Sequence, residues 1–420
     1  MIYTSLFILV TIAILTFLYS MLTGKVGIFF TQWVVYLVWF FCVPASLQYS
    51  AHQFPWPNYP KDNEINEVNT MSIVFTVFLF IGYSLCFKRV SGKRTNKYGY
   101  SVTTMTNILA MVMLLPAIVF IQITGVGSFF SGRSSLGEMV YADSFMPMLY
   151  ALSKFVAFGV LVVYLSLWKT KKTNFKHASG ATAVLMMSII VNFIINNPLS
   201  SPRFHFLSMT IALVIMAGFM NSKKSFVILF FASPILLFFL FPEIKHLGDS
   251  SQDFKTYDTE SYIVQGVDFD SFQQLVNILR YVQDKGYSYG MNFVAGVCFF
   301  IPRFVWESKP SNLGILAADH QGYFYTNLSA PLVGELYYAG SFIFIILGAF
   351  ILGGLTGKAD SLLRNKTISP MYLTGLWVSS FAFIVFRGSF GSVAPPITLG
   401  LCSSLILFAS AKRIPNHQVN

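Results

Sequence analysis

The sequence predicts an all-α, polytopic membrane protein with about eleven transmembrane helices. Hydrophobic residues make up 55% of the 420 residues and charged residues only 11%, whereas soluble domains average about 25% charged residues. Apolar runs of about 20 residues, the length needed to cross a bilayer, recur along the whole chain, and short basic segments separate them. We therefore expect residues 1–420 to form a single integral membrane domain.

The apolar runs place the expected spans. The first run, residues 2–22, has no basic stretch before it and no small-residue cleavage site after it. This pattern predicts a spanning helix and not a signal peptide. No internal repeat is detectable in the sequence. The spans are expected near residues 2–22, 28–48, 70–87, 102–123, 147–168, 179–196, 204–220, 225–241, 331–356, 370–386 and 393–411.

The distribution of charge orients these spans. The net charge is +11, but the basic residues cluster in short segments between apolar runs, which is the positive-inside pattern and does not indicate nucleic-acid binding. With these clusters in the cytoplasm, 17 of the 28 Lys and Arg residues lie inside, and Asp360 is the only one of 17 acidic residues to do so. The amino terminus and a long segment, 242–330, are then expected outside.

The long external segment, 242–330, is long enough to contain a functional site. Phe272, Leu275, Val276, Leu279 and Val282 recur at helical spacing, which predicts an amphipathic helix lying on the membrane or on the bundle. Ser271 with Gln274 resembles a capping box, and Gly286 could end the helix. The apolar stretch 293–301 is too short to span a bilayer, so we expect a re-entrant or buried helix there.

Four arginines lie where a charge is costly, next to apolar runs on the predicted outer face. Guanidinium groups bind phosphate through a bidentate fork, and ionisable groups at membrane depth are often functional. The set therefore suggests an anionic ligand at the outer face. Alternatively, each side chain could snorkel to the interface or pair with an external acid. The four residues are Arg133, Arg203, Arg303 and Arg387.

Glu335 and His320 are the candidates for proton transfer. Glu335 lies at the outer end of an apolar span, where partial desolvation would suit a general base; the alternative is a structural ion pair with one of the arginines. His320 could accept a proton, or could be a solvated loop residue. The motif Asp268-Phe269-Asp270 matches the metal-binding DxD pattern only weakly, since both acids also precede a predicted helix.

Several other classes of site are not indicated. The four cysteines lie in apolar stretches without CxxC spacing, so neither a disulfide framework nor a zinc site is suggested. The phosphate-binding pattern GxxxxGK[ST] does not occur, and the zinc-binding pattern HExxH is also absent. The motifs therefore indicate neither a zinc site nor an ATP-driven motor.

Two segments resemble a known family. The run 301–310, IPRFVWESKP, resembles the PR…W..KP segment of bacterial Wzy-type O-antigen polymerases. The run 329–340, SAPLVGELYYAG, is similar to that family's small-residue, Glu, aromatic, Gly segment, and Phe386-Arg387-Gly388 resembles its RG element. No RxxxxxxxxxxG pattern follows Arg203, which departs from some members of the family.

The resemblance implies a membrane glycosyltransferase of the GT-C class. It would join undecaprenyl-diphosphate-linked oligosaccharides on the periplasmic face of the inner membrane, with the lipid diphosphate as leaving group and without cofactor, and a chain-length regulator protein could assist. Arg203 and Arg303 are the first candidates for diphosphate contacts, supported by Arg133, Lys309 and Arg387. Trp306 is a candidate for stacking on a sugar, and Glu335, then His320, for the general base.

Two alternatives remain at this stage. An O-antigen ligase would use a similar donor with a different acceptor, the lipid A core. A flippase or transporter of lipid-linked oligosaccharides belongs to a different class, and it would usually show repeated halves and polar residues deep inside many spans.

Overall fold

The structure is a computed structural model that describes residues 2–88, 98–131, 133–141, 145–169, 179–240, 259–364 and 368–415. In this part of the chain, seven helical segments are long and apolar enough to cross a membrane, so the protein is an all-α, multi-pass membrane protein. The seven segments are Tyr3–Thr23, Ile28–Ser50, Asp62–Cys86, Thr104–Thr124, Met146–Trp168, Leu332–Arg364 and Phe390–Ala409.

The other four expected spans fall on shorter or interrupted helices. α8 (Ser179–Ile195) and α9 (Arg203–Ala217) are apolar but have fewer than 18 residues. α10 (Lys223–Ile235) continues as a π-helical turn, η5 (Leu236–Leu240). The run at 370–386 divides into α17 (Pro370–Ser380) and α18 (Ala382–Arg387).

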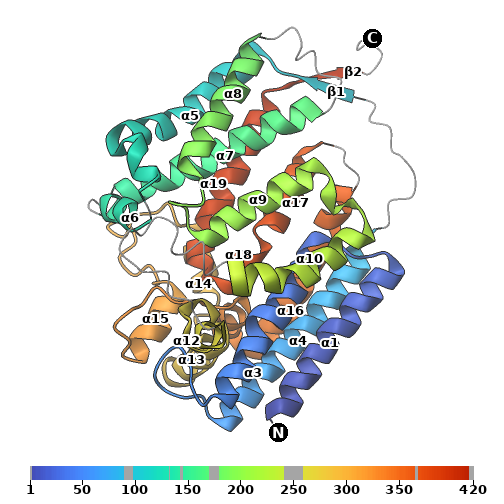
Figure 1. Cartoon of the computed structure of the whole chain (residues 1–420), viewed down its shortest axis with the longest axis vertical. Helices are drawn as coiled ribbons and strands as arrows, with labels where there is room; N and C mark the ends of the chain where they lie inside the picture. The colour runs from blue at the N-terminus through green and yellow to red at the C-terminus, as the bar shows by residue number, and fades with distance from the viewer. Residues whose placement is uncertain are drawn as a thin grey trace.

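The bundle has two helical groups joined by a central layer (Figure 1). One group contains α1 (Ile2–Thr23), α4 (Asp62–Cys86), α10 and α16 (Leu332–Arg364), and the other contains α5 (Thr104–Thr124), α7 (Met146–Lys169), α8 and α19 (Phe390–Ala409). Between them lie α9, α17 and α18. Near the carboxyl terminus, β2 (Lys412–Pro415) pairs with β1 (Tyr98–Ser101). The remaining described elements of the first half are η2 (Val126–Phe129), α6 (Arg133–Tyr141) and η4 (Phe219–Asn221).

The second expected span forms the centre of the core. It consists of α2 (Ile28–Val35), the π-helical η1 (Tyr36–Cys42) and α3 (Val43–Ser50). Every residue of α2 is buried, and its aromatic rings pack against α18, as Trp33 does against Phe386 with ring centroids 5.0 Å apart. The amino end of α2 is held by a distant residue, because the Phe29 amide donates to Asp360 Oδ2 at 3.0 Å.

α4 and α16 pack closely because glycines lie at their contact. A Cβ added at Gly82 would collide with the Phe350 carbonyl, and one added at Gly353 or Gly357 would collide with the backbone of α4. Small residues let helix backbones approach in membranes, where dispersion contacts drive association. This close packing against α4 fixes the position of α16, and with it the positions of the residues at both of its ends.

α16 is broken near the end that carries the long segment. Ser341 adopts a left-handed conformation with φ of 64°, and the Ser288 amide donates to the Tyr338 carbonyl at 2.8 Å beside the break. A helix of 33 residues would be about 50 Å long, which exceeds the roughly 30 Å of bilayer hydrocarbon. The break therefore separates a short helix, 332–339, from a run of spanning length, 342–364.

The described part of the long segment, 259–330, folds against one end of the bundle, at the far end from β1 and β2 (Figure 1). The helix predicted there is present as α13 and lies on the bundle, which is one of its two predicted positions, with the five predicted apolar residues all buried. The predicted capping box is wrong, because α13 begins after Asp270 without a side-chain cap. The elements of this segment are α12 (Thr259–Gln265), η6 (Val267–Phe269), α13 (Ser271–Lys285), α14 (Met291–Val297) and α15 (Leu313–His320).

Candidate functional site

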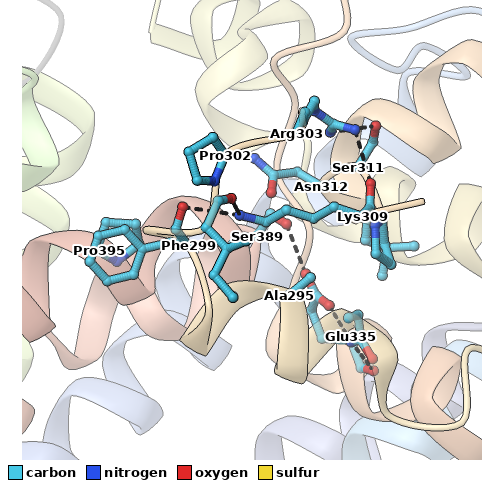
Figure 2. A pocket seen from close by; sticks show the side chains of 16 residues that line it. Ala295, Phe299, Pro302, Arg303, Lys309, Ser311, Asn312, Glu335, Ser389 and Pro395 are labelled. Atoms are coloured by element: carbon cyan, nitrogen blue, oxygen red, sulfur yellow. Dashed lines mark hydrogen bonds between the residues drawn. The ribbon is translucent and has the colours of Figure 1, made fainter. Parts of the chain in front are cut away.

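A cavity of about 420 Å³ lies where α14 and the segment after it meet the ends of α16 and α19. It gathers residues that are far apart in sequence, including Asn292, Arg303, Lys309, Glu335 and Ser389. Figure 2 shows Arg303 on one side of this lining and Glu335 on the other. The volume is within the range of small-molecule sites, about 300–1,000 Å³. Of the predicted site residues, the fold therefore brings Arg303, Lys309 and Glu335 to one cavity.

Glu335 is buried in the short helix before the break in α16, with 1% of its surface exposed. Asn292 Nδ2 donates to its Oε2 at 2.6 Å, while Ser389 Oγ and the Phe390 amide donate to its Oε1 at 2.8 and 3.0 Å. The Phe390 amide is the first of α19, and a helix amino terminus favours an anion. The carboxylate is thus held by neutral donors from α14 and from the start of α19. The sequence had also allowed an ion pair between Glu335 and an arginine, which is not the arrangement found in the described part of the chain.

Arg303 is the exposed cation at this cavity. Its guanidinium group donates to the Lys309 carbonyl at 2.9 Å and to Ser311 Oγ at 3.2 Å, and both partners belong to the same loop. A guanidinium group has five N–H donors, so these two bonds leave others for an anion. Its position follows from the turn after Pro302, where Val305 and Trp306 both donate backbone hydrogen bonds to the Pro302 carbonyl.

Lys309 has a different environment from Arg303. Its ammonium group donates to the carbonyl oxygens of Cys298, Phe299 and Ile301, each at 3.0 Å. An ammonium group has three N–H donors, so these bonds use all of them. Desolvation, and then the nearby Arg303 charge, lower the pKa of Lys309. Lys309 therefore ties the end of α14 to the loop that carries Arg303.

Arg203 and Arg387 lie outside the lining of this cavity and contact the DxD aspartates. Arg203 Nη2 is 2.9 Å from Asp268 Oδ2, and Arg387 Nη2 is 3.5 Å from Asp270 Oδ1. Arg387 also stacks over the ring of Phe204, 4.7 Å from its centroid. In the described part of the chain, no group of three or more His, Cys, Asp or Glu side chains is placed to hold a metal ion.

The carboxylates of the DxD motif are therefore charge partners for arginines. The Tyr262 hydroxyl also donates to Asp268 Oδ2 at 2.9 Å, and Ser329 Oγ donates to Asp270. Burial raises the pKa of Asp270, although Arg387 and Ser329 oppose this effect. The sequence allowed each arginine to pair with an external acid, but it did not identify which acid.

The other predicted site residues are more scattered. His320 Nε2 is 2.9 Å from Asp284 Oδ2, and its ring lies edge-on to Tyr281, outside the cavity lining. Trp306 is half-buried, and its indole N–H donates to Ser308 at 3.1 Å. Arg133 is the first residue of α6, and its side chain lies outside the part of the chain that the structure describes.

Sequence reasoning missed the polar residues that support Glu335. Asn292 and Ser389 come from segments almost 100 residues apart, and each is buried against the carboxylate. Asn312 also lines the cavity and donates to Ser392 Oγ at 2.8 Å. The available signal was the presence of an amide or hydroxyl at the end of an apolar run, but many such residues occur in this chain.

The cavity thus combines a buried carboxylate, an exposed guanidinium group and a set of amide and hydroxyl donors, where short helices meet the ends of spanning helices. Such a site could bind an anionic group at Arg303 and accept a proton at Glu335. Neither a family model, nor a curated protein, nor a solved structure matches this sequence.

Proposed function

We propose that this protein is a glycosyltransferase that joins undecaprenyl-diphosphate-linked oligosaccharide units on the periplasmic face of a bacterial inner membrane. One observation carries the proposal: the cavity lined by both Arg303 and Glu335 at the end of spanning helices. The resemblance of the runs 301–310 and 329–340 to Wzy-type polymerases supports it, since these two runs supply Arg303, Lys309 and Glu335.

The reaction would transfer the growing glycan from its lipid carrier to a new unit. A hydroxyl of the incoming unit attacks the anomeric carbon, the bond from this carbon to the diphosphate oxygen breaks, and undecaprenyl diphosphate leaves. Glu335 takes the hydroxyl proton, which typically accelerates such a step by about 100- to 10,000-fold. Arg303 stabilises the negative charge that develops on the leaving diphosphate. The diphosphate is the leaving group, so no nucleotide sugar is needed.

The chain offers a matched control for Glu335. Asp360 is also a buried carboxylate of α16 with three donors, namely the Phe29 amide, Tyr83 and Ser379. It lies 25 residues further along the same helix, away from the cavity. Converting either carboxylate to its amide places an N–H group against a donor, which costs about 1–3 kcal/mol of stability. Glu335→Gln and Asp360→Asn therefore differ mainly in their distance from the proposed chemistry.

Purified protein and lipid-linked repeat units would test the proposal, with chain length read on a gel. We expect Glu335→Gln to leave single units, whereas Asp360→Asn and His320→Ala should still polymerise. Polymerisation by Glu335→Gln at the wild-type rate would contradict the assigned role, and a simultaneous loss in His320→Ala would identify the histidine as the base.

Gene deletion would distinguish the polymerase from its alternatives by analysis of lipopolysaccharide. Loss of a polymerase leaves the core with one repeat unit. Loss of a ligase leaves bare core, and loss of a flippase also leaves core without polymer. A bare core would therefore contradict a polymerase.

A further inference from the structure

α14 separates the cavity from the outside of the bundle, and its two faces differ in chemistry. Asn292, Ala295, Gly296 and, one turn further on, Phe299 line the cavity. The spacing of Asn292, Ala295 and Gly296 places these three residues on one face of α14. The opposite face exposes Met291, Val294 and Val297. The wall of the cavity is thus one helix thick, with an outer surface made of large apolar side chains.

The exposed apolar surface continues beyond the end of α14. Phe300, Phe304 and Val305 are 69%, 82% and 66% exposed. A soluble protein rarely leaves a contiguous surface of this kind uncovered, and such patches usually mark contact with a partner or a membrane. Residues 291–305 thus present six large apolar side chains on their outer side, while their inner side faces the cavity.

Two contacts place α14 beside the outer turns of spanning helices. A Cβ added at Gly290 would lie 4.0 Å from Phe344, which is in the first turn of α16 after its break. The rings of Phe293 and Phe390 lie edge to face with centroids 4.9 Å apart, and Phe390 begins α19. α14 is therefore at the level at which both spanning runs begin.

The neighbouring surface of α16 has the same character. Ile343, Leu347 and Ile351 are 66%, 55% and 59% exposed, as expected for side chains that face lipid in a spanning helix. Around the apolar patch stand residue types that favour the boundary between hydrocarbon and water, among them Tyr289, Trp306 and Arg303. Residue types that favour lipid and residue types that favour its boundary with water thus occur together at this end of the bundle.

We propose that the segment 291–306 is inserted in the bilayer leaflet at this end of the bundle, with Met291, Val294, Val297, Phe300, Phe304 and Val305 in contact with lipid acyl chains. The cavity then opens at the depth of the lipid headgroups, with Arg303 at its rim. This insertion does not depend on which reaction the cavity performs. If the proposed function holds, it also lets a lipid-linked diphosphate reach Arg303 while its isoprenoid chain stays in the bilayer.

Spin labels in proteoliposomes would test the insertion. Single cysteines at Phe300 and Phe304 would be labelled in a chain whose four native cysteines have been replaced, with collisions measured against oxygen, which concentrates in lipid, and a water-soluble nickel chelate. Ile351 in α16 is the lipid reference. Phe324 is the matched control, because it is also an aromatic residue and is 95% exposed, but it lies in the loop after α15.

We expect the labels at 300 and 304 to behave like the one at 351, with high oxygen and low nickel accessibility, and the label at 324 to show the reverse. Equal accessibilities at 300, 304 and 324 would overturn the proposal. Low accessibility to both reagents that rises on dilution of the protein into lipid would also overturn it, since it would indicate contact with a second copy. Both results are independent of polymerising activity, so this test can fail while the proposed function stands.

Discussion

Arg203 and Asp268 form a two-pronged contact in which one guanidinium nitrogen lies 3.1 and 2.9 Å from the two carboxylate oxygens. The pair joins the first residue of α9 to η6, across 65 positions of sequence. Both side chains are largely buried, with 11% and 9% of their surfaces exposed. Two residues later, Asp270 pairs with Arg387 from the end of α18. The DxD motif therefore connects the long segment to the central layer of the bundle.

The first prediction is that Arg203→Ala destabilises the protein. It leaves the Asp268 carboxylate buried without its main charge partner, and breaking a buried pair costs about 3–5 kcal/mol. Thermal unfolding in detergent should show a lower Tm, and the double variant Arg203→Met/Asp268→Leu should recover much of the loss. An unchanged Tm in Arg203→Ala together with abolished polymerisation would instead indicate a direct contact with substrate.

The second prediction concerns pH and Asp270. Its pKa is raised above the ordinary 3.8 in the folded protein, chiefly by burial. The stability that its protonation contributes is therefore fully present below pH 3.8 and is lost as the pH rises through the folded pKa. Asp270→Asn imitates the protonated form, so the wild type should gain stability relative to this variant as the pH falls from neutral. Thermal unfolding of both proteins across this range provides the measurement.

A matched control for this experiment is Asp268→Asn, two residues away. It weakens the contact with Arg203 and places an amide N–H group against the guanidinium donors or the Tyr262 hydroxyl. We expect a clear loss of stability at neutral pH in this variant and little loss in Asp270→Asn. A wild type that loses stability relative to Asp270→Asn on acidification would contradict the assigned direction.

The third prediction concerns Arg303. Because this side chain is exposed and its two partners belong to its own loop, Arg303→Ala should leave Tm nearly unchanged while strongly slowing polymerisation. A hydrogen bond to a charged group is worth about 1.5–3 kcal/mol, which corresponds to a rate loss of roughly 10- to 150-fold. Arg303→Lys should also be poor, because an ammonium group lacks the planar fork. Normal long polymer from Arg303→Ala at a matched protein level would contradict this role.

The fourth prediction distinguishes Lys309 from Arg303. Lys309 uses its donors on three backbone carbonyls, so Lys309→Met should release the loop and misplace Arg303 without removing a substrate contact. We expect a lower rate and a lower Tm together, in contrast to Arg303→Ala.

The pH profile gives a second measurement on Lys309. The pKa of this lysine lies below its ordinary 10.5, so the wild-type rate should decline in alkaline solution as the ammonium group loses a proton and a hydrogen bond. The Met variant should lack this decline. A Lys309→Met protein with the same Tm and the same pH profile as the wild type would show that the three carbonyl contacts do not position the loop.

Much of the architecture follows from local sequence, and long-range pairing explains the rest. Runs of about 20 apolar residues identify spanning segments such as α5 and α19, because bilayer thickness sets the required length. The same rule does not reveal that the run at 370–386 is interrupted at Phe381, or that α16 is broken at Gly340 and Ser341. The break in α16 involves a neighbouring segment, because the Ser288 amide donates to the Tyr338 carbonyl beside it.

The candidate site shows the same limit. The sequence indicated that Arg303 and Glu335 lie next to apolar runs, and the fold places both at one cavity. It could not indicate which arginines meet acids, because Asp268 and Asp270 reach Arg203 and Arg387 only through tertiary packing. It also could not separate Lys309 from Arg303, since the different hydrogen-bond partners of the two cations depend on how the loop folds.

The bond from the Phe29 amide to Asp360 has a consequence for biosynthesis. It joins positions 331 residues apart, so the amino end of α2 has no side-chain partner at this position until the ribosome has passed residue 360. The rings that bury Trp33 and Tyr36 include Phe383 and Phe386, which are synthesised later still. The second hydrophobic segment to leave the ribosome therefore enters the membrane before some of the segments that surround it have been synthesised. Until these segments follow, it must stay in lipid or beside an insertion factor, and only then can it pack at the centre of the core.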